Sequence, residues 1–408
     1  RNNLGCPEIL VAMVRVEVLL LSGRGVAITA AEGLTLGDLK SVAQKRLAVG
    51  IAKLIHQDQI LSDATTLADA ALKDGDVLVA SLRAPEILGC RQCPAFFLVR
   101  GDGRVAVWGD VSLGVPRQLR NPQQVVGGRR ALAALVDGRV ITWGHSQFQP
   151  PAELLGQLEE VCQLCATEDA FAALRRDGQV LCWGEGAACD GNWVYQLLGE
   201  VLMLAASSSS FLAIAQDGLS AVTWGGRRDR GQLPQLHCRA QQVVATSHSF
   251  AVLQEDGQVL CWGRTCRPTL FPVLEEVSEL CASEDAFGAL RKDGTVVTWR
   301  PPKTTLEPVD GLSHVTQLVA SRHAFAALKR DGTVAAWGHP RFGGDAARLR
   351  NVQRLHASSG AFAALRADGS VRTWGDARCG GDATALKGQL ADVRRLCRFK
   401  RRFFETEE

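Results

Sequence analysis

An Asp-Gly pair followed six or seven residues later by Trp recurs eight times in this chain of 408 residues. The pairs begin 35 to 40 residues apart, and clear copies read AFAALRRDGQVLCWG and AFAALKRDGTVAAWG. Two short apolar runs separated by Asp-Gly are typical of a β-hairpin with a two-residue type I′ turn. Eight of the nine Trp belong to this repeat. The pairs begin at Asp102, Asp137, Asp177, Asp217, Asp256, Asp293, Asp331 and Asp368.

A further short strand is expected before each hairpin, for example at Val161–Ala166 and Val315–Ala320. Three or four strands in about 38 residues match the size of a β-propeller blade. The sequence therefore predicts a mainly β protein whose residues 84–404 form a propeller. Eight hairpins leave both seven and eight blades open, because terminal copies can share one blade. We interpret the repeated Phe and Trp as packing between the blades.

The repeat resembles that of the regulator of chromosome condensation family. The shared pattern is A/S-F-A-x-L-x-x-D-G-x-V-x-x-W-G, and the stretch Trp224–Leu233 is similar to that family's longer motif. His248 and His323 stand where the family has a His before its strand. The resemblance implies a propeller with a protein partner. Most copies lack the Gly-Gln-Leu-Gly that ends the family motif, and Trp299 is followed by Arg300 instead of Gly.

Residues 13–83 contain no copy of the repeat and are predicted to form a separate domain. Their pattern gives two strands, a helix over 36–47 with Thr35 as N-cap, and two further strands, which is a β-grasp order. This segment resembles ubiquitin. It lacks a terminal diglycine, so we expect a built-in domain and not a modifier. By the resemblance, Leu21 and Ile55 supply two apolar members of a recognition patch whose third position falls near Ala80; ordinary sheet residues are an equal alternative.

Composition limits the class of protein. Lys and Arg total 46 against 43 Asp and Glu, a net charge of +3, so we expect no nucleic-acid partner. No apolar run reaches the 18 residues of a membrane helix, and we expect no membrane contact. Thirteen scattered Cys favour a reducing compartment, the cytoplasm or the nucleus. We expect a monomer with an extension at 1–12, without a signal peptide, and an acidic tail at 405–408. The start at Arg1 indicates a fragment or a processed end.

No motif predicts a catalytic residue, a cofactor or a metal. The pairs Cys90/Cys93 and Cys162/Cys165 have a zinc-like spacing. However, Cys162 and Cys165 lie three apart on one predicted strand and point to opposite faces. Phosphate-loop, zinc-protease and serine-hydrolase motifs do not occur. The basic stretch 393–404 is a candidate for anionic partners, but we favour solvent-facing Arg side chains on an interrupted repeat.

Three functions remain open from the sequence. The first is a non-catalytic scaffold whose propeller loops bind a protein partner, with Arg227, Arg228 and Asp229 as candidate contacts and the ubiquitin-like domain as a second contact. The second is the recognition portion of a HERC-like ubiquitin ligase with partners in the ubiquitin pathway, whose catalytic HECT module is absent from this chain. The third is nucleotide exchange on a small GTPase. We favour the first, because the loops after Trp-Gly differ between copies while the strands do not.

Overall fold

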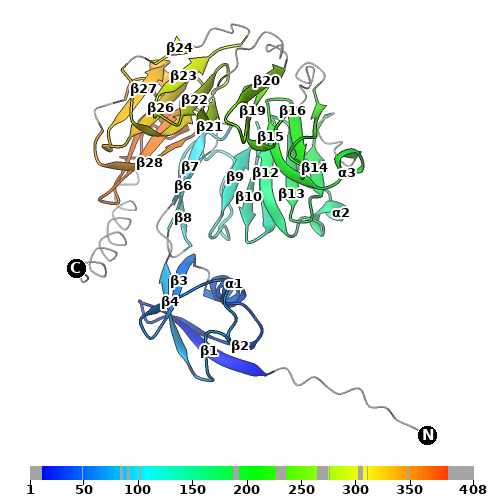
Figure 1. Cartoon of the computed structure of the whole chain (residues 1–408), viewed down its shortest axis with the longest axis vertical. Coiled ribbons are helices and arrows are strands. Elements are labelled where there is room, and N and C mark those ends of the chain that lie inside the picture. The colour runs from blue at the N-terminus through cyan, green and yellow to red at the C-terminus, as the bar shows by residue number, and fades with distance from the viewer. Residues whose placement is uncertain are drawn as a thin grey trace. The chain divides into compact units, whose positions relative to one another are not determined.

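A computed structural model of the chain contains two compact units, residues 1–85 with 99–105, and residues 86–98 with 106–408 (Figure 1). Each unit is described by itself. No helix in the described part of the chain is long and apolar enough to cross a membrane. The structure describes residues 12–47, 49–82, 86–89, 92–100, 103–186, 193–226, 236–263, 274, 276–301, 307–309, 311–346 and 349–384.

The first unit contains a five-stranded sheet in the order β2-β1-β5-β3-β4. β1 pairs antiparallel with β2 and parallel with β5. Alternate residues of β1 are buried against the helix, because successive side chains of a strand point to opposite faces. The elements are β1 (Met13–Leu20), β2 (Gly25–Ala31), α1 (Leu36–Leu47), β3 (Ile51–His56), β4 (Gln59–Leu61) and β5 (Val77–Leu82).

The helix begins and ends where the sequence predicts. Thr35 Oγ1 accepts the N–H of Asp38 at 3.2 Å and so caps the first turn. The short strand β4 was not predicted. It follows a two-residue turn at Gln57 and Asp58, whose φ angles of 48° and 66° are those of a type I′ turn. Gln-Asp is not a usual sequence for that turn, so the hairpin had no recognisable signal.

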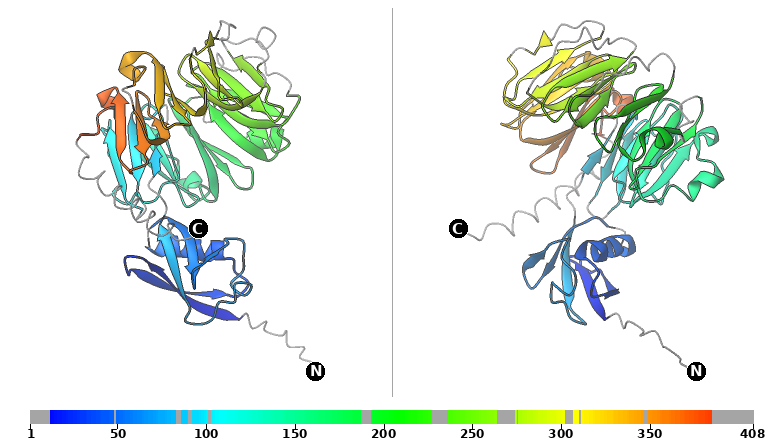
Figure 2. Two further views of the ribbon diagram at one scale, coloured as in Figure 1. Left: turned by 60° about the vertical axis from the view of Figure 1, so that its left-hand side comes forward. Right: turned by 45° about the vertical axis from the view of Figure 1, so that its right-hand side comes forward.

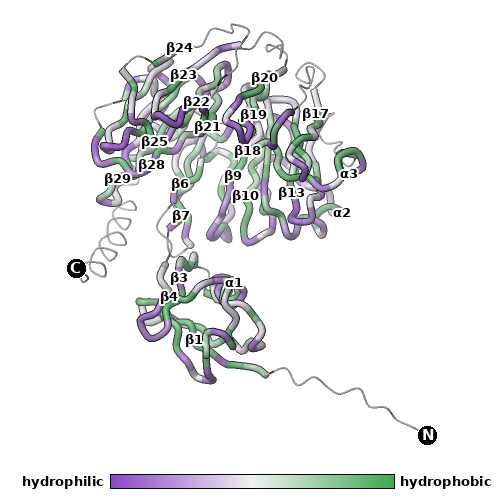
Figure 3. The backbone as a smooth tube through the Cα atoms, viewed as in Figure 1, coloured by the Kyte–Doolittle hydropathy of each residue, from purple (hydrophilic) through white to green (hydrophobic). Residues whose placement is uncertain are grey.

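The second unit is built from repeated antiparallel sheets, which agrees with the predicted β-propeller (Figure 2). The described residues form eight such sheets, numbered here in chain order, and each contains one predicted hairpin. Consecutive sheets lie side by side through their first strands. Figure 3 shows that the strands are mostly hydrophobic and the turns mostly hydrophilic.

The strands of sheets 1 to 4 are β6 (Glu86–Leu88), β7 (Ala95–Val99), β8 (Val105–Gly109); β9 (Gln124–Gly127), β10 (Ala131–Val136), β11 (Arg139–Gly144); β12 (Val161–Ala166), β13 (Ala170–Arg175), β14 (Val180–Gly184); β15 (Val201–Ala206), β16 (Ser210–Ala215) and β17 (Ala221–Gly225). Sheets 5 to 8 contain β18 (Ala240–Ala245), β19 (Ser249–Gln254), β20 (Val259–Gly263); β21 (Val277–Ala282), β22 (Phe287–Arg291), β23 (Val296–Trp299), β24 (Glu307–Pro308); β25 (Val315–Ala320), β26 (Ala324–Lys329), β27 (Val334–Gly338); β28 (Val352–Ala357), β29 (Ala361–Arg366) and β30 (Val371–Gly375). Short helices α2 (Ala152–Leu155) and α3 (Trp193–Leu198) follow sheets 2 and 3.

The predicted turn type is right in only one of the described hairpins. Asp137 and Gly138 both have positive φ, as a type I′ turn requires. In the other described copies only the Gly has positive φ. There the Asp carboxylate accepts the N–H two residues ahead, as Asp331 does from Thr333 at 2.9 Å. That bond holds the Asp in an ordinary conformation, so Gly alone takes the left-handed one.

The aromatic residues of the repeat form one stacked pair in each of seven sheets. Phe171 and Trp183, for example, lie on paired strands with their rings nearly parallel and their centroids 5.4 Å apart. Trp183 and its counterparts in sheets 4 to 6 are fully buried. These residues form the cores between the sheets, as the sequence predicts. The other pairs are Phe96–Trp108, Phe211–Trp224, Phe250–Trp262, Phe287–Trp299, Phe325–Trp337 and Phe362–Trp374.

A glutamine clasp joins neighbouring sheets. Gln242 on the first strand of sheet 5 donates to the Leu280 carbonyl of sheet 6 at 2.9 Å and accepts the Leu280 N–H at 2.8 Å. These backbone groups lie on the edge of β21 that no strand covers. The same pair of hydrogen bonds joins Gln124 to Leu164, Gln163 to Leu204 and Gln317 to Leu355.

In sheet 6 the clasp position is occupied by Glu279. Burial raises the pKa of the Glu279 carboxyl, and the hydrogen bond from the Leu318 N–H opposes that rise. An ionised carboxylate accepts this N–H but has no hydrogen to donate to a carbonyl. The folded protein therefore binds this proton more tightly than the unfolded chain does, and its stability falls as the pH rises through the folded-state pKa.

We predict that Glu279→Gln raises the free energy of unfolding by about 1 kcal/mol at pH 7, because an uncharged amide completes the clasp. The gain should shrink toward pH 4, where the carboxyl takes up a proton. Chemical denaturation at both pH values measures this. The matched control is Gln242→Glu, which should lower the free energy of unfolding at pH 7. The clasp would be contradicted if Gln242→Glu were as stable as the wild type, or if Glu279→Gln did not raise the free energy of unfolding.

His356 is the second unusual residue of the first strands. Burial is the main cause that lowers its pKa to about 4, and the nearby Arg354 charge adds to the effect. Its Nε2 is buried without a hydrogen-bond partner. The unfolded chain takes up this proton near pH 6.5, well before the folded protein does. Stability is therefore complete above pH 6.5 and is lost as the pH falls toward 4.

The wild type should lose up to about 3 kcal/mol of unfolding free energy between pH 6.5 and pH 4, because the difference in the pKa of His356 between the folded and unfolded states corresponds to that free energy. We predict that His356→Val removes this loss. Valine already occupies the equivalent position as Val319 of sheet 7. Unfolding free energies compared at pH 7.5 and pH 4.5 test this. An unchanged pH slope in the variant would show that His356 is not responsible.

Candidate functional site

The loops that join the first and second strands are here called the rim loops, and five of them share one construction. A Ser or Thr accepts the N–H three residues ahead, as Thr167 Oγ1 does from Ala170 at 2.9 Å. This side-chain bond replaces a backbone partner and fixes the turn. The equivalent bonds involve Ser207 and Ser210, Thr246 and Ser249, Ser283 and Ala286, and Ser358 and Ala361.

The rim loops are also bonded to each other. From sheet 2 to sheet 8 a backbone N–H of each loop donates to the equivalent carbonyl of the next loop, and the last sheet reaches the first through Ser359 N–H and Cys93 O at 2.9 Å. A loop that is hydrogen-bonded to the loops of both neighbouring sheets holds its side chains in fixed positions. The other donor and acceptor pairs are Arg129 and Glu168, Glu168 and Ser208, Ser208 and Ser247, Ser247 and Glu284, Glu284 and Arg322, and Arg322 and Ser359, at 2.7 to 3.2 Å.

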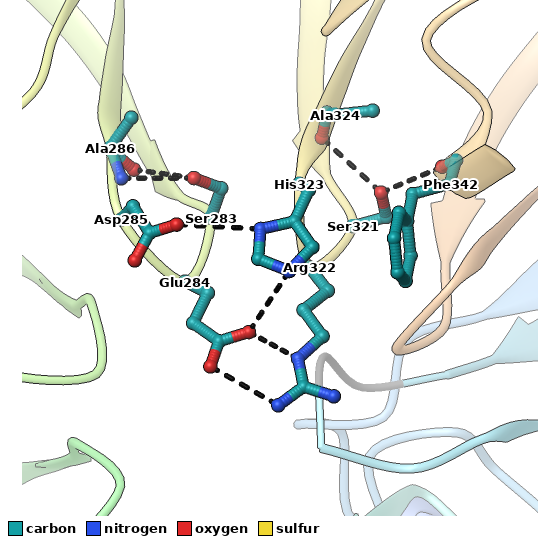
Figure 4. Close-up of polar contacts among 9 residues, drawn as sticks. All are labelled: Ser283, Glu284, Asp285, Ala286, Ser321, Arg322, His323, Ala324 and Phe342. Carbon is teal, nitrogen blue, oxygen red and sulfur yellow. Dashed lines mark hydrogen bonds and ion pairs between the residues drawn. The ribbon is translucent and has the colours of Figure 1, made fainter. Parts of the chain in front are cut away.

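Opposite charges meet at the rim between sheets 6 and 7 (Figure 4). The Arg322 guanidinium donates to both carboxylate oxygens of Glu284, and this bond raises the pKa of Arg322. His323 lies between two carboxylates, with Nε2 3.5 Å from Glu284 and Nδ1 3.4 Å from Asp285. Arg129 and Glu168 form a similar pair between sheets 2 and 3.

An aromatic side chain borders this charged cluster. The Phe342 ring meets the His323 ring edge to face at 4.7 Å and the His339 ring at 5.3 Å. The buried Ser321 hydroxyl donates to the Phe342 carbonyl at 2.9 Å and so fixes the loop. Arg341 beside it donates to Asp376 of the next sheet at 2.9 Å.

This arrangement is suited to polar recognition. The Ser321 hydroxyl contacts the carbonyls of Ala324 and Phe342, so its hydrogen is engaged with the backbone. Asp285 keeps a side chain that is 54% exposed. Within the described residues no group of three His, Cys, Asp or Glu is placed to hold a metal ion.

The predicted contacts Arg227, Arg228 and Asp229 lie outside the described residues. Gly226, which precedes them, donates its N–H to the Ser209 carbonyl of a rim loop at 2.8 Å, so that segment begins beside the rim. The charged rim residues Glu168, Glu284 and Arg322 were not among the predicted contacts. The signal for them was the position shared by Glu168, Glu284 and Arg322, three residues before the Phe of their repeats.

The two predicted contacts of the first unit lie on its sheet. Leu21 is 66% exposed after β1, and Ile55 is partly buried on β3. Ala80, the expected third member, is 1% exposed in the core. Its neighbour Val79 lies on the face opposite the helix, where it pairs with both Leu19 and Ile55.

Cys162 and Cys165 have no shared ligand geometry. Cys162 donates to the Leu174 carbonyl at 3.4 Å, and burial raises the pKa of Cys165 to about 12. One is exposed and the other lies toward a core, as expected from their spacing on a strand. Cys93 is buried, while its neighbour Cys90 lies outside the described residues.

Several solved structures match parts of the chain. They include the ectodomain of the receptor kinase CR4 from Physcomitrella patens, 19% identical with a TM-score of 0.46, which covers 63% of this chain and 74% of its own. Yeast RCC1 (Prp20), solved with Kap60, is 14% identical with a TM-score of 0.46 over 69% of this chain and 88% of its own. Ubiquitin from Caldiarchaeum subterraneum is 18% identical with a TM-score of 0.17 over 18% of this chain and 96% of its own.

No known family description and no curated protein matches the chain. With TM-scores below 0.5, the structural likenesses do not decide its function.

We predict that Ser321→Ala lowers the free energy of unfolding by about 1 to 2 kcal/mol, because the Phe342 carbonyl loses a buried hydrogen bond. Arg322→Ala is the control at the next position. Its ion pair is largely exposed, so the change should be below about 1 kcal/mol. Denaturant titration of both variants tests this. The account of the rim fails if the Arg322 variant is the less stable of the two.

Proposed function

We propose that the protein is a non-catalytic interaction scaffold, a closed propeller of eight blades whose rim binds a protein partner. The observation that carries this proposal is the chain of backbone hydrogen bonds between the rim loops. Those bonds hold backbones that are alike while the side chains differ, from Glu168 to Ser208 to Arg322. A rigid frame with variable side chains is what selective protein binding requires, because little conformational freedom is lost on association.

We further propose that the first unit is a ubiquitin-like domain and acts as a second contact. Leu19, Val79, Ile55 and Ile60 are neighbours across four strands of one sheet face. Ile60 is 55% exposed, and Val77 and Leu21 extend the apolar area along the strands. A helical segment of a ubiquitin-pathway protein has the shape and polarity to cover such a face.

Affinity capture with the full chain tests the scaffold proposal. Proteins retained by the wild type should be lost with the rim variant Asp169→Lys/Asp285→Lys, which reverses two exposed rim charges. The control is Glu153→Lys, a charge reversal on the exposed helix α2 away from the rim loops. Capture by quantitative mass spectrometry should be unchanged for the control. A capture profile that the rim variant leaves intact would remove the rim from the interface.

A further inference from the structure

The Asp-Gly turns lie at the opposite ends of the second strands from the rim loops, and their surroundings differ in charge from sheet to sheet. These turns pack on the start of the next sheet: the carbonyl of Gly332 accepts the N–H of Val352 at 3.0 Å, and Gly218 does the same for Ala240 at 2.8 Å. Equivalent positions of the repeats can therefore be compared directly on one backbone.

The turn side of sheets 7 and 8 is basic. This side carries four basic residues and only two acidic ones, Asp331 and Asp368 of the Asp-Gly turns. They are continuous, because the Arg366 guanidinium donates to the Arg350 carbonyl at 3.1 Å and Asn351 contacts the Gly332 turn. The four residues, here called the basic sector, are Lys329, Arg330, Arg350 and Arg366.

The turn side of sheets 4 and 5 is acidic instead. Glu255 precedes its turn Asp as Arg330 does, and each donates its backbone N–H to the residue before the first strand at 2.9 Å. Around these turns one basic residue, Arg239, stands against four acidic ones. The acidic residues are Glu200, Asp217, Glu255 and Asp256.

The charges of the basic sector are available to a partner. Arg330 and Arg350 are exposed, and in the described chain neither they nor Lys329 form an ion pair. The Asp331 carboxylate is engaged in its own turn, where it accepts the N–H and the hydroxyl of Thr333 at 2.9 and 2.6 Å. Arg366 is paired with Asp368 at 3.7 Å, whereas Lys329, Arg330 and Arg350 present cations that no described ion pair neutralises.

We propose that the basic sector binds an acidic segment of a protein partner, a run of Asp and Glu side chains; this inference rests on the proposed scaffold function and adds a second face to it. Guanidinium groups recognise carboxylates through paired hydrogen bonds. A nucleic acid is the less favoured partner. The sector's four residues, with Asp331 and Asp368 in the turns, include no aromatic side chain for base stacking.

The test uses the full chain and a fluorescein-labelled polyglutamate of 20 residues, followed by fluorescence anisotropy. We expect binding at 50 mM NaCl that weakens at least tenfold at 300 mM, since salt screens exposed charges. The variant Lys329→Glu/Arg330→Glu/Arg350→Glu should bind at least tenfold more weakly. A milder set of Gln substitutions at the same positions, with circular dichroism, distinguishes lost binding from lost folding.

The matched control is Arg139→Glu/Arg176→Glu/Arg239→Glu, which makes the same change in net charge on the turn side of other sheets. It should keep the wild-type affinity within about twofold, because salt screens the attraction between the peptide and charges that lie far from its binding site. Absence of polyglutamate binding at 50 mM NaCl, or equal losses in both triple variants, would overturn the proposal. So would tenfold tighter binding of a labelled 20-nucleotide DNA.

The two proposals fail separately. Polyglutamate binding does not depend on the rim residues, and the capture experiment does not depend on the basic sector. Rim-dependent capture without polyglutamate binding would remove only the basic sector. Polyglutamate binding without rim-dependent capture would contradict the proposed role of the rim and leave the turn side as the binding surface.

Discussion

The uncovered edge of each first strand is the constraint on which the second unit depends. The first strand pairs with the second on one side only, so its other side presents backbone N–H and carbonyl groups that need partners. The glutamine clasp provides both partners from the neighbouring sheet, as Gln163 does for Leu204. One side chain thus satisfies an edge and joins two sheets. Without it, the edge would be a site for association with other strands.

The exit loops contribute a second kind of joint. Gly343 follows sheet 7, and its carbonyl accepts the Trp374 indole N–H of sheet 8 at 3.0 Å. Gly380 does the same for Trp108 of sheet 1 at 3.1 Å and so joins the end of the repeats to their beginning. A Cβ at Gly380 would approach Phe96 to 2.7 Å. These glycine loops, considered from sequence as binding loops, are therefore part of the packing.

Much of the fold could be predicted because its signals are local. The Asp-Gly and Trp spacing gave the hairpins, and the apolar pattern with Thr35 gave the helix. The clasp joins residues 38 to 41 positions apart in different repeats, so no local pattern announces it. Its trace was the recurring Gln of VCQLCA and VTQLVA. The site was harder to predict, because the charges of Glu284 and Arg322 acquire meaning only when the ring of loops brings adjacent sheets together.

Residue-resolved hydrogen exchange tests the closed, clasped ring most directly. The decisive comparison is between the amides of Leu355 and Ser359 in sheet 8, next to the closure, and that of Leu164 in sheet 3, far from it along the chain. A closed ring predicts that all three exchange on one timescale, set by cooperative unfolding. Much faster exchange of Leu355 and Ser359 would mean that the first and last sheets separate, and would contradict the closed ring.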